Sequence, residues 1–306
     1  MHELIIIGGG PAAISAGIYA ARKKIKTVLI AKEIGGQVTR TASIENYPGF
    51  ESISGPDLIK KLLSHLKGLI DNGFEIKKGT EVKEIKQVDN LIEVDTSDGS
   101  YQAKVVVITT GARPKKLSIP GEDEFSGKGV SYCSTCDAPV FKDKEVAIAG
   151  GGNAGLEASL DLSKYASKIY LFEYMDKLSG DEYLQEKVSQ DTRINVITRA
   201  RLKEIRGDKF IKSLIYSDNG QDKEIPIQGV FIEIGSIPNS AFVKDMVELN
   251  ETGEIKVDSK NRTSVENIFA AGDVTDVSHK QIVIATGQGA KAILNAYDYL
   301  RKMKGE

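Results

Sequence analysis

The two cysteines of this 306-residue chain, Cys133 and Cys136, are separated by only two residues. Two thiols at this spacing can form a small redox-active disulfide ring, and Asp137, the next residue, could carry the proton that thiol–disulfide exchange requires. The alternatives are half of a zinc site for the cysteines and an ordinary helix cap for Asp137. The chain has no second cysteine pair, and its 3 histidines lack zinc-ligand spacing. The motif predicts dithiol redox chemistry and no metal site.

A first glycine turn follows the short apolar run at residues 4–7. Gly8, Gly10 and Ala13 fit the pattern G-x-G-x-x-G/A, in which backbone N–H groups and a helix N-terminus bind a pyrophosphate. The alternative is a tight strand-to-helix turn without a ligand. The acid expected at the end of the next strand is absent, and only Glu33 lies beyond that strand. The turn predicts a dinucleotide site whose ribose contact stays open.

A second glycine turn, with Gly150, Gly152 and Gly155, matches the same pattern in full. Glu173 lies at the end of the following strand, where a carboxylate accepts hydrogen bonds from a ribose 2′-hydroxyl and repels a 2′-phosphate. The alternative for Glu173 is a solvated strand-end charge. The second turn therefore predicts a nicotinamide site that prefers NADH, with NADPH less favoured.

The elements around these motifs repeat. In both halves an apolar run leads into a glycine turn and a helix, and later a strand ends in glycine, at Gly111 and at Gly235. The tail, with a strand at 267–270 and a helix from Gln281, is too short to fold alone, so we expect it to complete the first domain. The expected fold is α/β with two Rossmann-like three-layer dinucleotide-binding domains of the FAD/NAD(P) type, the second inserted into the first. The expected boundaries are 1–114 for the first part of the FAD domain, 115–239 for the nicotinamide domain with the CxxC, and 240–306 for the second part of the FAD domain.

Composition and net charge indicate which classes of partner to expect. The net charge is −2 and 41% of the residues are hydrophobic, values typical of a globular protein without a field that attracts nucleic acid. The sequence begins with MHELIIIGGG, in which no basic segment precedes the apolar run and the run itself is very short, so we expect neither a signal peptide nor a membrane span. The expectation is a cytoplasmic protein without nucleic-acid or membrane partners.

Several motifs together resemble the low-molecular-weight thioredoxin reductases, and also the reductase portion of the alkyl hydroperoxide reductase flavoprotein subunit. They are GGGPAAISAGIYAAR, GGQ at 35–37, ENYPG at 45–49, TGARP at 110–114, CSTCD, GGGNAG, AAGDV and KQIVIATGQGAKA. The resemblance covers essentially the whole chain. It implies a homodimer in which the first domain and the tail bind FAD, while the inserted domain binds the nicotinamide and carries the CxxC.

The resemblance also implies roles for individual residues. Cys136 would face the flavin, Cys133 would attack the partner's disulfide, and Asp137 would be the general acid. The residues expected around FAD are Gly8, Gly10, Pro11 and Ala12 at the pyrophosphate, Gly36, Gln37 and Asn46 nearer the flavin, Asp273 at the ribityl chain, Gln281 and Ile282 at the isoalloxazine edge, and also Glu33, Val82, Gly111, Gly272 and Lys280. The residues expected around the nicotinamide cofactor are Gly150, Gly152, Asn153, Ala154, Gly155 and Glu173.

Two departures from the family pattern refine the expected function. Residues 173–176 read EYMD where the NADPH-using reductases carry a His-Arg-Arg cluster, which again favours NADH. The thioredoxin-like domains of the hydroperoxide reductase protein are missing, so we expect a separate thioredoxin-fold or glutaredoxin-like dithiol protein to take the electrons. The expected activity is that of an FAD-dependent thioredoxin-disulfide reductase. The alternatives are a ferredoxin-fed flavin disulfide reductase with a vestigial nicotinamide site, the reductase component of a peroxiredoxin system, and a redox-sensing binding protein.

Overall fold

The structure is a computed structural model, and it describes residues 1–41, 44–218 and 220–305. The chain divides into two compact units. The first unit contains residues 1–41, 47–113 and 237–305, and the second contains residues 114–218 and 220–236 together with the short stretch 44–46. The second unit is therefore inserted into the first along the sequence.

The first unit is built on a sheet whose central part is parallel. Its strand order is β3-β2-β1-β6-β5-β4, and β17 pairs with β6 on a separate branch. The strands are β1 (His2–Ile7), β2 (Thr27–Ala31), β3 (Phe74–Lys78), β4 (Val82–Val88), β5 (Leu91–Thr96), β6 (Gly99–Ile108) and β17 (Ile268–Ala270). The strands β1, β2, β3, β6 and β17 run parallel, whereas β4, β5 and β6 form an antiparallel meander.

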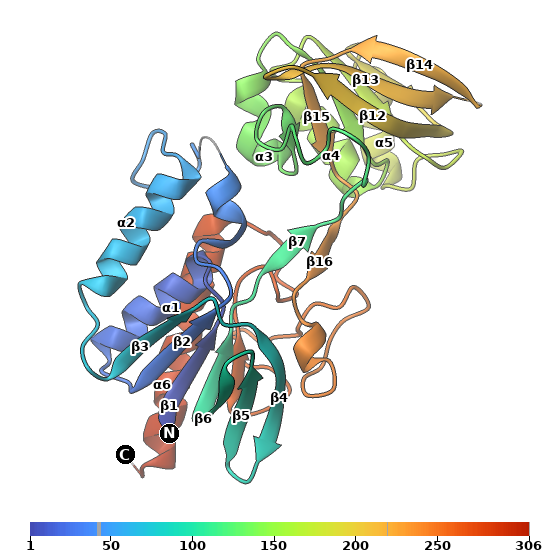
Figure 1. Cartoon of the computed structure of the whole chain (residues 1–306). Coiled ribbons are helices and arrows are strands. Elements are labelled where there is room, and N and C mark those ends of the chain that lie inside the picture. The colour runs from blue at the N-terminus through green and yellow to red at the C-terminus, as the bar shows by residue number, and fades with distance from the viewer. Residues whose placement is uncertain (42–43, 219, 306) are drawn as a thin grey trace. The chain divides into compact units, whose positions relative to one another are not determined.

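Helices cover this sheet, as Figure 1 shows. They are α1 (Pro11–Arg22), α2 (Gly55–Lys67) and α6 (Ile282–Met303), with short 3₁₀ turns at Gly36–Arg40 and Ala241–Val243. The run Thr27–Ala31 is buried throughout, as expected for a parallel strand covered on both faces. Helix α6 packs so closely on α1 that a Cβ at Gly289 would lie 2.2 Å from the Ala12 carbonyl oxygen. The tail therefore completes the first unit with both β17 and α6.

The second unit contains a parallel sheet and a separate antiparallel one. The parallel sheet has the order β11-β10-β9-β15-β8, and the second sheet the order β12-β13-β14. The strands are β8 (Val130–Ser131), β9 (Glu145–Ala149), β10 (Lys168–Phe172), β11 (Ile194–Ile197), β12 (Ala200–Gly207), β13 (Ile211–Asp218), β14 (Gln221–Pro226) and β15 (Gly229–Ile232). The helices are α3 (Ser134–Asp137), α4 (Asn153–Leu162) and α5 (Glu182–Gln190), with a 3₁₀ turn at Ala138–Phe141.

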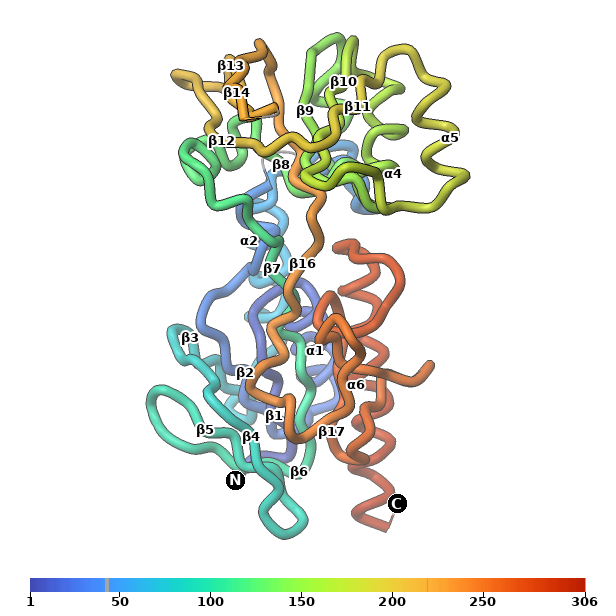
Figure 2. The backbone as a smooth tube through the Cα atoms, turned by 90° about the vertical axis from the view of Figure 1, so that its right-hand side faces the viewer, coloured from blue at the N-terminus to red at the C-terminus, as the bar shows by residue number. Residues whose placement is uncertain are grey.

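Two short strands form the connections between the units. Strand β7 (Ala112–Pro114) leads out of the first unit, strand β16 (Ser236–Pro238) leads back, and the two pair with each other. Figure 2 shows them side by side, as does Figure 1.

The expected α/β fold with two dinucleotide-binding folds, the second inserted in the first, is confirmed. The meanders of the two halves differ more than the sequence repeat indicates. In the first unit β6 is both the last strand of the meander and the central strand of the main sheet. In the second unit β15 pairs with β9 and β8, and the meander stands apart as its own sheet. The repeat predicts a strand that ends in glycine in both halves, but it does not predict this difference in pairing.

Candidate active site

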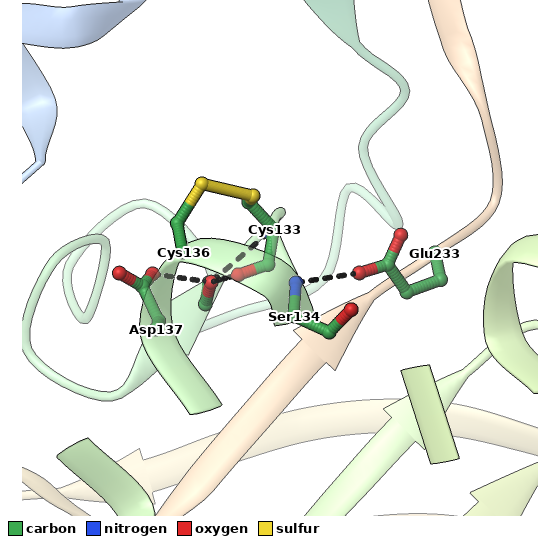
Figure 3. The surroundings of a disulfide bond; sticks show 6 residues. Cys133, Ser134, Cys136, Asp137 and Glu233 are labelled. Carbon is green, nitrogen blue, oxygen red and sulfur yellow. Dashed lines mark hydrogen bonds between the residues drawn. A yellow bond between two sulfur atoms is a disulfide. The ribbon is translucent and has the colours of Figure 1, made fainter. Parts of the chain in front are cut away.

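The two cysteines are joined in a disulfide whose Cα atoms lie 5.3 Å apart. Strand β8 ends at Ser131, and Cys133 immediately precedes the short helix α3, which contains Cys136 (Figure 3). Both cysteines are half-buried. The sequence therefore holds a redox-capable pair at the end of an edge strand.

Asp137 lies beside this disulfide and is held by Ser131. The Ser131 hydroxyl donates a hydrogen bond to Asp137 Oδ2 at 2.5 Å, and its oxygen accepts one from the Cys133 N–H at 3.1 Å. Burial raises the pKa of Asp137, while the hydrogen bond from Ser131 opposes this rise. A carboxyl group with a raised pKa can hold a proton close to the sulfurs, which is the requirement of a general acid.

The structure adds Glu233, which the sequence analysis does not identify. This residue follows β15, and its Oε1 accepts a hydrogen bond from the Ser134 N–H at 3.3 Å. Burial raises the pKa of Glu233 to about 7. The one sequence signal is a charged residue at the end of the apolar run 229–232, just before Gly235.

The sheet explains why these groups gather. The strands β8, β15, β9 and β10 are neighbours and run parallel. Parallel strands place their carboxyl ends at one edge, which is where open α/β sheets bind ligands. β8 is followed by residues 133–136, called here the cysteine turn, and its neighbour β15 is followed by Glu233. Next in the sheet, β9 is followed by the glycine turn from Gly150, and β10 by Glu173.

The second glycine turn is shaped by close backbone contacts. Gly150 has φ +119°, and a Cβ there would lie 2.5 Å from the Glu233 carbonyl oxygen. A Cβ at Gly155 would lie 1.8 Å from the Gly150 carbonyl oxygen, so only glycine fits. At Gly152, which precedes α4, a Cβ would meet nothing closer than Ser179 Oγ at 3.7 Å. The space before this helix N-terminus is suited to a phosphate.

Glu173 is directed at this turn. Its Oε2 accepts a hydrogen bond from the Gly151 N–H at 2.7 Å, and its Oε1 accepts one from the Met175 N–H at 2.7 Å. Of the other expected residues, Asn153 accepts a hydrogen bond from the Asp181 N–H at 2.7 Å, and Ala154 is exposed. Glu173 is thus fixed beside the second glycine turn and is no free strand-end charge.

The first glycine turn has the same design in the first unit. Gly8 has φ +129°, and a Cβ there would lie 2.4 Å from the Thr109 carbonyl oxygen. A Cβ at Gly10, which precedes Pro11 and α1, would meet no atom within 4 Å. Gly36 lies next to it, since its Cβ would be 3.5 Å from Gly10 Cα. This open space before α1 can accept a pyrophosphate.

The tail contributes further residues to the same region. Gly272 follows β17, and a Cβ there would lie 3.1 Å from Ala12 Cβ at the start of α1. Burial raises the pKa of the adjacent Asp273, and the nearby charge of Lys280 opposes the rise. Lys280 itself forms a 2.9 Å ion pair with Glu254. The structure brings Gly8, Gly10, Gly36 and Gly272 together around the start of α1.

The remaining expected residues occupy varied positions. Glu33 is exposed, but its backbone packs on the turn, where a Cβ at Gly9 would lie 2.1 Å from the Glu33 carbonyl oxygen. Gln37 donates a side-chain hydrogen bond to the Ala112 carbonyl oxygen at 2.5 Å. Val82 packs against the core, and Gly111 follows β6 with φ +66°. Gln281 and Ile282 lie at the start of α6. Asn46 is exposed in the stretch 44–46.

Two further properties of the described residues concern metal binding and membrane-spanning helices. Among residues 1–41, 44–218 and 220–305, no group of three or more His, Cys, Asp or Glu side chains could hold a metal ion. Within the same residues, every helix is too short or too polar to cross a membrane.

Two dinucleotide-binding folds, one of which carries a disulfide at its ligand edge, define a class of redox flavoprotein. The sequence model described as pyridine nucleotide-disulphide oxidoreductase matches residues 2–289. The chain belongs to this family, and membership implies flavin and nicotinamide cofactors.

Known relatives agree with this assignment. The F subunit of alkyl hydroperoxide reductase in Staphylococcus aureus is 40% identical over 302 residues, which cover 98% of this chain and 59% of the relative. The chain thus spans about three-fifths of the length of the curated relatives it matches. The crystal structure of thioredoxin reductase from Streptococcus pyogenes has a TM-score of 0.93 and 35% identity over 99% of both chains. Thioredoxin reductase from Giardia duodenalis has a TM-score of 0.90 and 31% identity, over 98% of this chain and 99% of that one.

Proposed function

We propose that this protein is an FAD-dependent thioredoxin-disulfide reductase that uses NADH. The observation that carries the proposal is the Cys133–Cys136 disulfide at the carboxyl edge of the sheet that also carries the second glycine turn. A nucleotide site and a disulfide on one sheet suit an enzyme that moves reducing equivalents between them.

The first unit has the features that a bound FAD requires. The N-terminus of α1 follows a glycine whose Cβ would meet no atom within 4 Å, so its backbone N–H groups can approach a pyrophosphate. We assign Gly8, Gly10, Pro11 and Ala12 to this contact and Asp273 to the ribityl hydroxyls. When bound, FAD supplies the redox chemistry that connects a nicotinamide hydride with a disulfide.

NADH is favoured as the donor because of Glu173. Two backbone N–H groups fix this carboxylate beside Gly151, and its remaining lone pairs can accept from ribose hydroxyls. A 2′-phosphate there would face Glu173, with Asp176 three residues further on and no arginine between them. If only reduced ferredoxin delivers electrons, the nicotinamide site is vestigial.

The cysteines perform the exchange with the partner. The Cys133 thiolate attacks one sulfur of the partner's disulfide, forms a mixed disulfide and releases the other sulfur, which takes a proton. The Cys136 thiolate then attacks Cys133 Sγ, which reforms the Cys133–Cys136 bond and releases the second partner sulfur, which also takes a proton. Asp137, with its raised pKa, is suited to give a proton to a leaving sulfur. The partner gains two electrons and two protons.

The proposed partner is a separate thioredoxin-fold or glutaredoxin-like protein with a dithiol. A second candidate, the reductase component of a peroxiredoxin system, is favoured by the 40% identity to the F subunit of alkyl hydroperoxide reductase. The homodimer implied by the resemblance stays a prediction.

The cysteine variants test this function. Cys133→Ser and Cys136→Ser should each abolish NADH-driven reduction of a dithiol protein, since each step needs its own sulfur. Cys133→Ser should also leave a thiolate beside the oxidised flavin and give a long-wavelength charge-transfer absorbance, which Cys136→Ser should lack. The reverse spectra would exchange the two cysteine roles. Full turnover in either variant would refute the proposed function.

A further inference from the structure

Glu233 contacts both functional regions of the second unit. Strand β15 lies between β8, which leads to the cysteines, and β9, which leads to the glycine turn. The Glu233 N–H donates to the Ala149 carbonyl oxygen at 2.9 Å, and its own carbonyl oxygen would lie 2.5 Å from a Cβ at Gly150. Its side chain turns to the cysteines and accepts from the Ser134 N–H.

This carboxyl group is placed on the Cys133 side of the disulfide. Ser134 directly follows Cys133, so its N–H belongs to the peptide bond that joins the two residues. Figure 3 shows Glu233 at this end of the cysteine turn and Asp137 at the other. Asp137 is bound to Ser131, whereas Glu233 is bound to Ser134, so the two carboxyl groups have separate partners.

The surroundings of Glu233 favour its neutral form near pH 7. Burial raises the pKa of Glu233 to about 7, and the negative charge of Glu157 on α4 adds to this effect. The hydrogen bond from the Ser134 N–H acts in the opposite direction. The group therefore changes its charge in the pH range in which a reactive cysteine ionises.

We propose that Glu233 is a positioning residue that controls the charge of the Cys133 thiol in the reduced protein. Reduction by a dithiol or by the reduced flavin breaks the Sγ–Sγ bond, adds two electrons and takes up two protons to give two thiols. Cys133 must then lose one proton to become the attacking thiolate. A carboxylate at the same end of the turn disfavours this second negative charge, so the two groups ionise in two coupled steps.

The inference deepens the proposed function, since it sets the conditions under which Cys133 attacks. With Glu233 neutral, the thiolate forms more easily. With Glu233 ionised, the thiol keeps its proton and exchange slows. Asp137 then gives a proton to the leaving sulfur, while Glu233 controls how easily the attacking Cys133 thiol ionises.

The experiment measures the ionisation of each cysteine separately in the full chain. Cys136→Ser leaves Cys133 as the sole thiol, and its rate of alkylation by iodoacetamide is followed from pH 5 to pH 10. Adding Glu233→Gln keeps an acceptor for the Ser134 N–H but removes the charge. We expect the apparent pKa of Cys133 to fall by about one unit, which is up to a tenfold rise in thiolate at pH values where Glu233 is ionised in the unsubstituted protein and the thiol is still mostly protonated. The same substitution should shift Cys136 less, measured in Cys133→Ser.

Glu224→Gln, an exposed neutral substitution on β14 of the same unit, is the matched control and should shift neither thiol. An unchanged Cys133 titration in Glu233→Gln, or an equal shift in the control, would overturn the inference. Should Glu233→Gln fail to fold, a ¹³C carboxyl titration of the unaltered reduced protein tests the same coupling. Glu233 should then show a second inflection where the thiol ionises, and a single inflection would contradict the inference. Turnover decides the proposed function separately, because these titrations need no nicotinamide, flavin or partner.

Discussion

After β1 and after β9 the chain makes the same strand–turn–helix unit, but the neighbours of the two turns differ. In the second turn, Glu173 accepts from the Gly151 N–H, and the Glu233 carbonyl oxygen packs where a Cβ at Gly150 would be. In the first turn, the Glu33 backbone packs against Gly9, and Gly36 and Gly272 approach from other segments. One backbone design thus supports two ligands, because residues outside the turn decide what can bind.

The two turns also differ at the last position of the G-x-G-x-x-G/A pattern. Gly155 has no room for a side chain, since its Cβ would lie 1.8 Å from the Gly150 carbonyl oxygen, whereas the first turn accommodates a fully buried Ala13 at the equivalent position. Gly155→Ala should destabilise the second unit by about 3 kcal/mol because backbone must move. Ala13→Gly should cost the first unit only about 1 kcal/mol. Amide hydrogen exchange measured separately in α4 and α1 checks both values. Equal losses would show that the two turns tolerate a methyl group alike.

The strand-end acid gives the next largest effect. The wild type should prefer NADH over NADPH by about 10²-fold in kcat/KM, roughly 2.7 kcal/mol, from one hydrogen bond and one repulsion. Glu173→Arg should shift this preference toward NADPH, because it removes the repulsion and adds a cation. Glu224→Arg, at an exposed acid on β14 of the same unit, is the matched control and should leave the ratio unchanged. Equal use of both nucleotides by the wild type would show that Glu173 does not read the ribose.

The sequence predicts the parts of the site whose signal is local. Glycine turns, buried strand runs and the cysteine pair depend on residues close in the chain, so the turns at Gly8 and Gly150 and the strands before them are readable. The Ser134–Glu233 contact joins residues 99 positions apart, and no local pattern reveals it. The separate sheet of β12, β13 and β14 is missed for the same reason, because strand pairing depends on which distant partner is available.

The smallest expected effect concerns stability against pH. The pKa of Glu233 is raised in the folded protein to about 7 from its ordinary 4.5, so folding favours the protonated form. The stabilising contribution is complete below pH 4.5 and is lost as the pH rises through about 7. Between pH 5 and pH 8 the wild type should lose about 2.5 kcal/mol of unfolding free energy relative to Glu233→Gln. Hydrogen exchange in β15 and β9 measures the difference, and parallel pH profiles of the two proteins would contradict the assigned pKa.

The most direct test of the central claim is an anaerobic titration of the FAD-loaded protein with NADH, with free thiols counted after each addition. We expect the disulfide to open and two thiols per chain to appear, at Cys133 and Cys136, since one hydride carries the two electrons that the bond requires. These free thiols should be detected before any partner protein is added. If NADH produces no thiols although reduced ferredoxin does, the nicotinamide site is vestigial. If neither donor opens the Cys133–Cys136 bond, the protein is no disulfide reductase of the proposed kind.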